Sequence, residues 1–236
     1  MPNPKRWRHP NTDRSWYSCR DLHTWNDDLA DVARTLIDAA RDGQWDTVFR
    51  TLNANDTHDL VNVWRPGGTA EYTALHHAAR LGHRRAALRL LARGAWRCMP
   101  NAKGETPADV ARRHGHDALA ASIAPLDDLR YVKSQLPALQ HWFTALVRAR
   151  LSHDRTLWQS LRLPELVVVV ESAPQAVYFP VPGLGGGFLL RYGTERDLPH
   201  GAPVITVNSW SRMSSGSEET HRITEGECRR EPTALP

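Results

Sequence analysis

The sequence predicts a chain of mixed α and β structure, in which a short helical solenoid of about three repeated units precedes a small α+β domain. Two observations lead to this prediction. Similar sequence elements recur 33 residues apart, from Thr73 to Thr106 and from Gly82 to Gly115, and such a period is typical of stacked helical repeats. After Pro125 the repeat ends, and short apolar runs bounded by glycine and proline follow, which indicates strands.

The bulk composition is that of a globular protein. Hydrophobic residues make up 41% of the 236 residues and charged residues 24%, which excludes disorder of the whole chain. The three cysteines are odd in number and far apart, so no disulfide framework is predicted. No apolar run approaches the roughly 20 residues of a transmembrane helix, and the N-terminus does not resemble a secretory signal. We therefore expect a cytoplasmic protein with no membrane partner.

Three segments are expected: a basic N-terminal tail over residues 1–24, the repeats over residues 25–125, and the α+β domain over residues 126–230. The first twenty residues contain five basic residues and one acidic residue. The aromatic residues of the tail include Trp7, Trp16 and Tyr17. Such a segment could bind phosphates and stack on bases, but termini are usually poorly ordered, so a solubilising tail is favoured.

The repeat is clearest when "TALHHAARLGH" (Thr73 to His83) is aligned with "TPADVARRHGH" (Thr106 to His116). Both stretches open with threonine, contain a central alanine and close with Gly-His, and a weaker copy, "DAARDGQWDTVFRTL", lies upstream. Threonine can cap a first helix, glycine can end it, and a second amphipathic helix follows. One such unit cannot bury its apolar face alone, so neighbouring units must stack.

These elements resemble the ankyrin repeat. The matching residues of the central copy are Thr73, Leu75, His76, Ala78, Ala79, Gly82, His83, Leu90, Leu91, Gly94 and Ala95, and those of the next copy are Gly104, Thr106, Pro107, Ala111, Gly115 and His116. The resemblance covers about residues 29–124. The whole chain is also similar to uncharacterised bacterial, actinobacterial-type ankyrin repeat proteins, through pieces such as "GAWR" and "FPVPGLGGGF".

The resemblance implies that the histidines of the repeats are structural. In ankyrin-like repeats, a histidine at the positions of His76, His83 and His116 hydrogen-bonds the backbone between units. The structural repeat residues are then His76, Gly82, His83, Gly115 and His116. His77 should point elsewhere. Metal binding is the alternative, but no cysteine or carboxylate completes a ligand set at zinc-like spacing, so we expect no metal and no cofactor.

The resemblance also implies a protein-binding face, made by the hairpins between units and by the first helices. The contact residues carried over by position are Thr69, Ala70, Tyr72, Arg80 and Leu81 in the second copy and Ala102, Lys103, Glu105, Arg113 and His114 in the third. Tyrosine and arginine are frequent in interface hot spots. The groove could instead be too short, or be filled by the chain's own flanks. Trp96 is expected either to pack on the neighbouring unit or to anchor a partner.

In the C-terminal part, helices are predicted over residues 137–151 and around residues 155–161. Strands are predicted in "AVYFPVPG", "GFLLRYG", "APVITVNSW" and "THRITEGEC", and their short connections favour an antiparallel meander. The stretch "LVVVVES" is either a fifth strand or the end of a helix. Pro180 and Pro182 place the first strand at an edge of the sheet.

The sequence favours a non-enzymatic protein-binding module, of which an inhibitor or immunity-type protein is one version. The partner would be a protein whose identity, like the oligomeric state, the sequence does not predict. A small hydrolase or transferase is the alternative, with a site at Arg212, Ser214 and His221, although the Gly-x-Ser-x-Gly elbow is missing. The glycine-rich "PVPGLGGGF" lacks the lysine and the following helix of a phosphate loop. Nucleic-acid binding through the basic tail is a second alternative.

Overall fold

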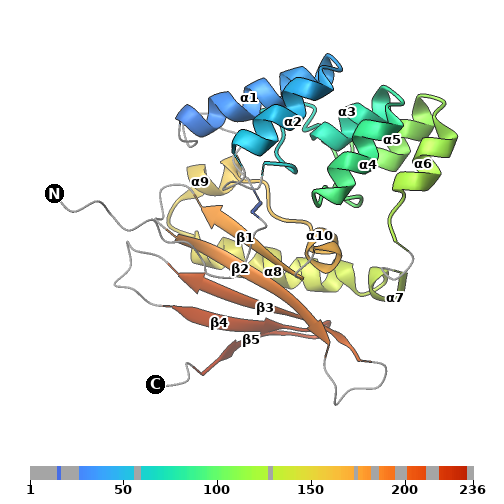
Figure 1. Ribbon diagram of the computed structural model, residues 1–236. Helices are drawn as coiled ribbons and strands as arrows, with labels where there is room; N and C mark the ends of the chain where they lie inside the picture. Colours follow the sequence, from blue (N-terminus) through green and yellow to red (C-terminus); the bar gives the residue numbers. More distant parts are fainter. Residues whose placement is uncertain are drawn as a thin grey trace.

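The computed structural model describes residues 15–16, 27–55, 60–126, 130–172, 175–181, 186–194, 201–210 and 218–232. Within these ranges, helices fill the N-terminal and central parts of the chain, and a five-stranded antiparallel sheet forms the C-terminal part (Figure 1). The mixed α and β composition predicted from the sequence is confirmed.

Three consecutive helix pairs form one layer of the molecule (Figure 1). The first pair is α1 (Asp27–Arg41) with α2 (Trp45–Ala54), the second is α3 (Ala74–Arg80) with α4 (Arg84–Ala92), and the third is α5 (Pro107–Arg113) with α6 (Asp117–Ile123). The first helices pack on one another in the order α1, α3, α5, and α4 also contacts α6. Neighbouring pairs therefore lie side by side and share one apolar interior.

Short-range sequence features explain where these helices begin and end. The first helix of each pair is followed by a glycine with positive φ, namely Gly43 (73°), Gly82 (65°) and Gly115 (77°), a conformation that most other residues adopt at a cost. At the start of α5, Thr106 and Asp109 cap each other, with the Thr106 N–H donating to the Asp109 carboxylate over 3.0 Å. At the start of α3, the side chain of His76 accepts the corresponding hydrogen bond from the backbone N–H of Thr73. Asp109 therefore takes the capping role in α5 that His76 has in α3.

The sheet is a meander in the order β1-β2-β3-β4-β5, with every neighbouring pair antiparallel. Its strands are β1 (Ala176–Val181), β2 (Gly186–Thr194), β3 (Pro203–Trp210), β4 (Glu219–Ile223) and β5 (Cys228–Glu231). The prediction of β1 as an edge strand is confirmed, and Pro180 lies within it. The prediction of one strand in "THRITEGEC" is wrong, because a turn closed by the Thr224 N–H and the Glu227 carbonyl separates β4 from β5.

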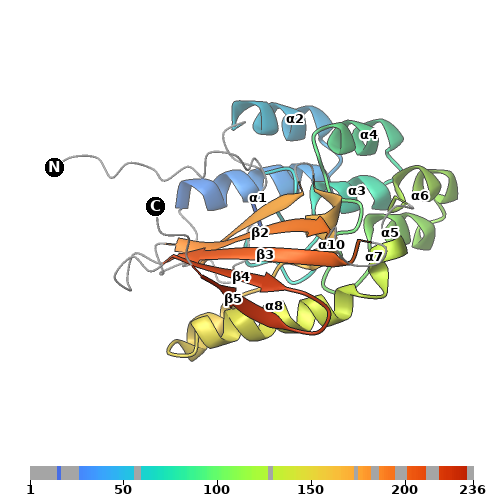
Figure 2. The same ribbon diagram turned by 90° about the horizontal axis from the view of Figure 1, so that it is seen from below.

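The remaining helices connect the layers. They are α7 (Arg130–Lys133), α8 (Leu136–Arg150), α9 (Arg155–Ser160) and α10 (Leu166–Glu171). Helix α8 buries Leu139, Phe143, Leu146 and Val147 and runs along the β4 and β5 side of the sheet (Figure 2). Both helices predicted in this region are present as α8 and α9. Among the described residues, no helix is long and apolar enough to cross a bilayer.

The ambiguous stretch "LVVVVES" forms the short helix α10 rather than a strand. Most of its valines are buried between the helix pairs and the sheet, where α10 contacts α8, β1 and β2. At its end, the Glu171 carboxylate accepts hydrogen bonds from the backbone N–H groups of Arg97 (2.7 Å) and Cys98 (2.8 Å) in the turn after α4. Tertiary contacts therefore override the strand preference of valine.

A tryptophan cluster joins the helix pairs to the C-terminal part. Trp16 is fully buried, stacks on Trp96 with ring centroids 5.8 Å apart, and meets Trp64 edge-on at 5.7 Å. Its backbone N–H donates to the Tyr178 carbonyl (2.8 Å), and its indole N–H donates to the Arg162 carbonyl (2.8 Å). Residues 15–16 therefore lie beside the open edge of β1 and contribute to the core.

This position excludes Trp16 from the base-stacking hypothesis for the N-terminal tail, residues 1–24. Trp16 is a core residue and cannot stack on bases without leaving the interior. Trp7 and Tyr17, the other aromatic residues of that hypothesis, lie outside the described residues. Trp96 is also buried, and its indole N–H donates to the Ser172 hydroxyl at the end of α10 (2.9 Å). The interpretation of Trp96 as an exposed anchor is therefore wrong.

A buried ion pair lies next to the tryptophan cluster. Arg162, just before α10, contacts the Glu71 carboxylate at 2.7 Å, and the two side chains are only 7% and 5% exposed. The guanidinium also donates to the Pro100 carbonyl (2.8 Å) and lies 5.3 and 5.1 Å from the ring centroids of Trp16 and Trp64. Glu71 has a φ of 53°, the only positive value at a non-glycine residue in the described part of the chain. Arg162 thus fixes a strained turn of the second pair to the C-terminal part.

Candidate functional site

The predicted partner-contact residues lie on the turns that precede α3 and α5 and at the ends of these two helices. Seven of the ten are exposed and three are half-buried. The exposed ones are Thr69, Ala70, Leu81, Ala102, Lys103, Arg113 and His114, and the half-buried ones are Tyr72, Arg80 and Glu105. The two turns are joined by a backbone hydrogen bond from the Ala102 N–H to the Ala70 carbonyl (3.1 Å). We call this set of ten residues the contact face.

At the junction of the second and third pairs, Arg113 connects two side chains of the contact face. Its guanidinium donates to the Tyr72 hydroxyl (2.9 Å) and pairs with the Glu105 carboxylate (2.9 Å). The Asn101 amide also donates to Glu105 (2.9 Å). The hydrogen bond from Asn101 and the positive charge of Arg113 hold the pKa of Glu105 below its usual range. The polar groups at this junction are therefore held in fixed positions.

At the junction of the first and second pairs, Arg80 has a corresponding role. Its guanidinium donates to the Arg41 carbonyl at the end of α1 (2.7 Å). The next residue, Leu81, is 40% exposed, which is unusual for a large apolar side chain, and it lies close to Gly43. The contact face thus touches all three pairs.

His76 links two pairs under the contact face. Its Nδ1 lies 3.2 Å from the backbone nitrogen of Thr73 and 2.9 Å from the Thr73 hydroxyl, and its Nε2 lies 3.2 Å from the Glu105 carbonyl. The imidazole is fully buried and stacks under the Tyr72 ring, with centroids 5.3 Å apart. His76 therefore positions Tyr72 as well as joining the second pair to the third.

The other two repeat histidines make different contacts from those that the resemblance implies. His83 bonds within its own pair, where Nδ1 accepts from the Ala86 N–H (3.2 Å) at the start of α4. His116 packs its ring against Gly82, so closely that a Cβ on this residue would lie 2.6 Å from the imidazole. The glycine is therefore required both by its positive φ and by the ring of the next pair. Gly115, with nothing close to it, is required by its φ alone.

His77 points away from the turn hydrogen bonds and is also buried. Its ring lies 5.2 Å from that of Tyr72, and its Nδ1 has no hydrogen-bond partner among the described residues. Burial lowers the pKa of His77 from 6.5 to about 4 and that of His76 to about 3, and nearby arginines act in the same direction on His77. Both imidazoles are therefore neutral in the folded protein near pH 7.

This burial predicts a loss of stability in acid. The unfolded chain takes up a proton on each histidine near pH 6.5, whereas the folded chain does so only near pH 3 to 4. Between these values the unfolded state binds more protons, so the free energy of unfolding should decrease as the pH is lowered, by up to about 1.4 kcal/mol per pH unit for each histidine. Urea unfolding at pH 4.5 to 7 measures this slope.

The matched variants are His77→Gln, which should remove a large part of the slope, and His114→Gln, which changes an exposed histidine of the same region and serves as the control. An equal slope in His77→Gln and in the wild type would show that the imidazole of His77 is not kept neutral by the fold.

The residues of the enzymatic alternative are only partly described, because Arg212 and Ser214 lie outside the described residues. His221 lies on β4, and its Nε2 is 3.9 Å from the Glu219 carboxylate, which is also paired with Arg150 (3.0 Å) and Arg230 (3.3 Å). Burial lowers the pKa of His221. In the described part of the chain, this arrangement is an ion-pair cluster that ties α8 to the sheet.

Ser209, in the same part of the sheet, does not have the contacts of a catalytic nucleophile within the described ranges. Ser209 pairs with Glu219 across β3 and β4, and its hydroxyl accepts a hydrogen bond from Arg150 (2.8 Å). No hydrogen bond joins it to His221 in the described structure. In addition, no group of three His, Cys, Asp or Glu side chains among the described residues is arranged to hold a metal ion.

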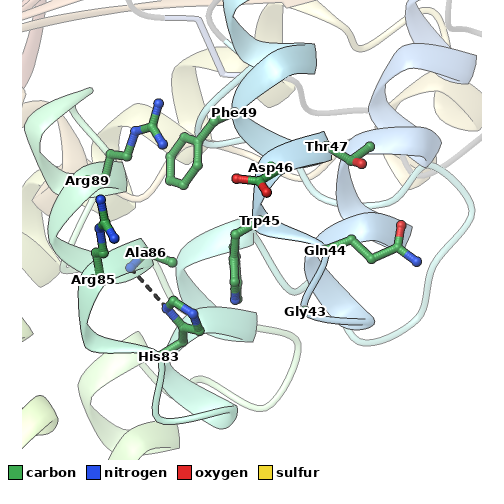
Figure 3. A pocket seen from close by; sticks show the side chains of 10 residues that line it. All are labelled: Gly43, Gln44, Trp45, Asp46, Thr47, Phe49, His83, Arg85, Ala86 and Arg89. Carbon is green, nitrogen blue, oxygen red and sulfur yellow. Dashed lines mark hydrogen bonds between the residues drawn. The ribbon is translucent and has the colours of Figure 1, made fainter.

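A pocket that the sequence analysis missed lies between α2 and α4 (Figure 3). It has a volume of about 490 Å³. Its lining consists of Gly43, Gln44, Trp45, Asp46, Thr47, Phe49, His83, Arg85, Ala86 and Arg89. The available signal was the i, i+4 spacing of Trp45 with Phe49 and of Arg85 with Arg89, which puts each pair on one helix face.

No protein-family model matches the chain, and no curated protein matches its sequence significantly.

Proposed function

We propose that this chain is a non-enzymatic, cytoplasmic protein-binding module, in which three ankyrin-like repeats present the contact face to a partner protein. Three features support the repeat assignment: side-by-side helix pairs, a positive-φ glycine after each first helix, and a histidine that bonds the next pair. An inhibitor or immunity-type protein, which would bind one partner tightly, is one specific version of this proposal.

The observation that carries the proposal is the pair of side-chain bridges at the two junctions of the contact face. Arg80 reaches the first pair, and Arg113 holds Tyr72 of the second pair. Side chains that are already ordered lose less conformational entropy on binding than free ones. Tyrosine and arginine are also the residue types that most often dominate binding energy. The face therefore combines suitable chemistry with rigidity.

A partner pull-down with charge-matched variants tests this proposal. The bait Arg80→Ala/Arg113→Ala removes two arginines from the contact face, and the control Arg84→Ala/Arg148→Ala removes two exposed arginines elsewhere. We expect the wild type and the control to recover the same proteins from a lysate of the native host, and the face variant to lose at least one of them. Binding of the recovered protein is then measured with purified components, where a loss of tenfold or more is expected.

Equal recovery by all three baits, at equal melting temperatures, would contradict the contact face. Recovery that depends on the control arginines instead would move the interface to α4 or α8.

A further inference from the structure

We propose that the pocket between α2 and α4 binds a monoanionic organic carboxylate with an aromatic or aliphatic body. The pocket lies between second helices, whereas the contact face is built from turns and first helices, and no residue of the contact face lines it. The proposal therefore does not rest on the proposed function. The volume of about 490 Å³ falls within the range of small-molecule sites, about 300–1,000 Å³.

The apolar part of the pocket is formed by two aromatic rings on α2. Trp45 and Phe49 are one helical turn apart, and Figure 3 shows the Phe49 ring directed toward Arg89 on α4 and the Trp45 ring near His83. Trp45 lies beside the His83 ring, with centroids 5.2 Å apart. Arg89 covers the Phe49 ring, with its guanidinium carbon 3.8 Å from the centroid. Phe49 is only 4% exposed, so the apolar body of a ligand would meet mainly the half-buried Trp45 ring, which the neighbouring His83 ring helps to hold in place.

The polar groups that face these rings are mainly hydrogen-bond donors. Neither Arg85 nor Arg89 makes a hydrogen bond or an ion pair with another described residue. The Nδ1 of His83 accepts from the Ala86 N–H, so in the neutral ring the proton is on Nε2, which can donate. The indole N–H of Trp45 likewise has no acceptor within the described ranges. Four side chains thus offer donors to one small space.

The charge of the lining selects the class of anion. Two guanidinium groups are opposed by one carboxylate, that of Asp46, which leaves a net charge of about +1 when His83 is neutral. Gln44 and Thr47 point away from the arginines (Figure 3). A carboxylate of charge −1 matches this balance and can accept two hydrogen bonds from an arginine side chain. A phosphate monoester has nearly twice the charge and fits the balance less well.

A titration followed by the indole N–H signal of Trp45 in ¹H–¹⁵N NMR spectra tests the proposal, with the signal assigned through Trp45→Phe. The probes are phenylacetate for a free small acid and N-acetylphenylalanine for the carboxyl end of a peptide. The neutral phenylacetamide and the dianionic phenyl phosphate serve as comparisons. We expect at least one carboxylate to bind, at least tenfold more tightly than phenylacetamide. The tighter of the two carboxylates identifies the source of the ligand.

Charge-matched variants locate the binding. Arg85→Gln should weaken carboxylate binding at least tenfold. Because Arg85 makes no hydrogen bond or ion pair with the described residues, the stability of the fold should stay unchanged. Arg84→Gln changes the neighbouring exposed arginine outside the lining and should have no effect. The proposal is overturned if no carboxylate shifts the Trp45 signal up to its solubility limit. Equal binding of phenylacetamide, tighter binding of phenyl phosphate, or unchanged binding by Arg85→Gln would overturn it as well.

Discussion

Replacing Trp16 by alanine should lower the free energy of unfolding by about 3–5 kcal/mol, the range for removing a large buried aromatic side chain. The indole is fully buried and contacts Trp64 and Trp96, so its removal leaves a cavity that rigid rings cannot fill. The hydrogen bond to the Arg162 carbonyl is lost as well. Denaturant unfolding monitored by far-ultraviolet circular dichroism measures this change in the free energy of unfolding.

The variant Trp16→Phe separates the two contributions. It keeps an aromatic ring in the cluster and removes the indole N–H, so the loss should be clearly smaller than for alanine. If Trp16→Ala unfolds at the same denaturant concentration as the wild type, residues 15–16 do not contribute to the core.

The second large effect is expected at the buried ion pair. Arg162→Met should cost about 3–5 kcal/mol, because it breaks a buried ion pair and takes away the positive charge that faces the Glu71 carboxylate. The Pro100 carbonyl would lose a donor at the same time. Replacing both residues, as in Arg162→Met/Glu71→Gln, also removes the buried negative charge and should recover part of the loss. Urea unfolding of the two single variants and the double variant gives the coupling energy.

If the double variant loses as much unfolding free energy as the two single variants together, Arg162 and Glu71 are not coupled. This result would contradict the proposed role of Arg162. If Arg162→Met does not fold, the double variant still tests the pair. It should regain a cooperative unfolding transition only if the buried carboxylate of Glu71 causes the loss.

The helix pairs could be predicted because their signals are local. Threonine caps, a glycine at a fixed position and apolar spacing all lie within one unit, as at Thr106 and Gly115. Strand positions could be predicted for β1 to β3 for a similar reason, since turn residues bound them. The β4–β5 turn was missed because "THRITEGEC" contains only one glycine, Gly226, and reads as a single polar strand.

Long-range contacts could not be predicted. Nothing near Trp16 indicates that it packs with Trp64 and Trp96, because the three residues meet only when the chain folds back on itself. The strained turn at Glu71 likewise depends on Arg162, which is 91 residues away. The pocket was missed because two separate helix faces, each ordinary alone, form it only together. The surface position of the contact face followed from the repeat pattern, whereas its bridges at Arg80 and Arg113 did not.

The bond between Glu171 and the backbone after α4 has a consequence for the evolution of the chain. In a simple stack of repeated units, each unit contacts only its neighbours. Here the turn after the second helix pair is also bound to α10, because the N–H groups of Arg97 and Cys98 donate hydrogen bonds to Glu171. An inserted or deleted helix pair next to it would displace these contacts, so the C-terminal half of the chain constrains the number of helix pairs.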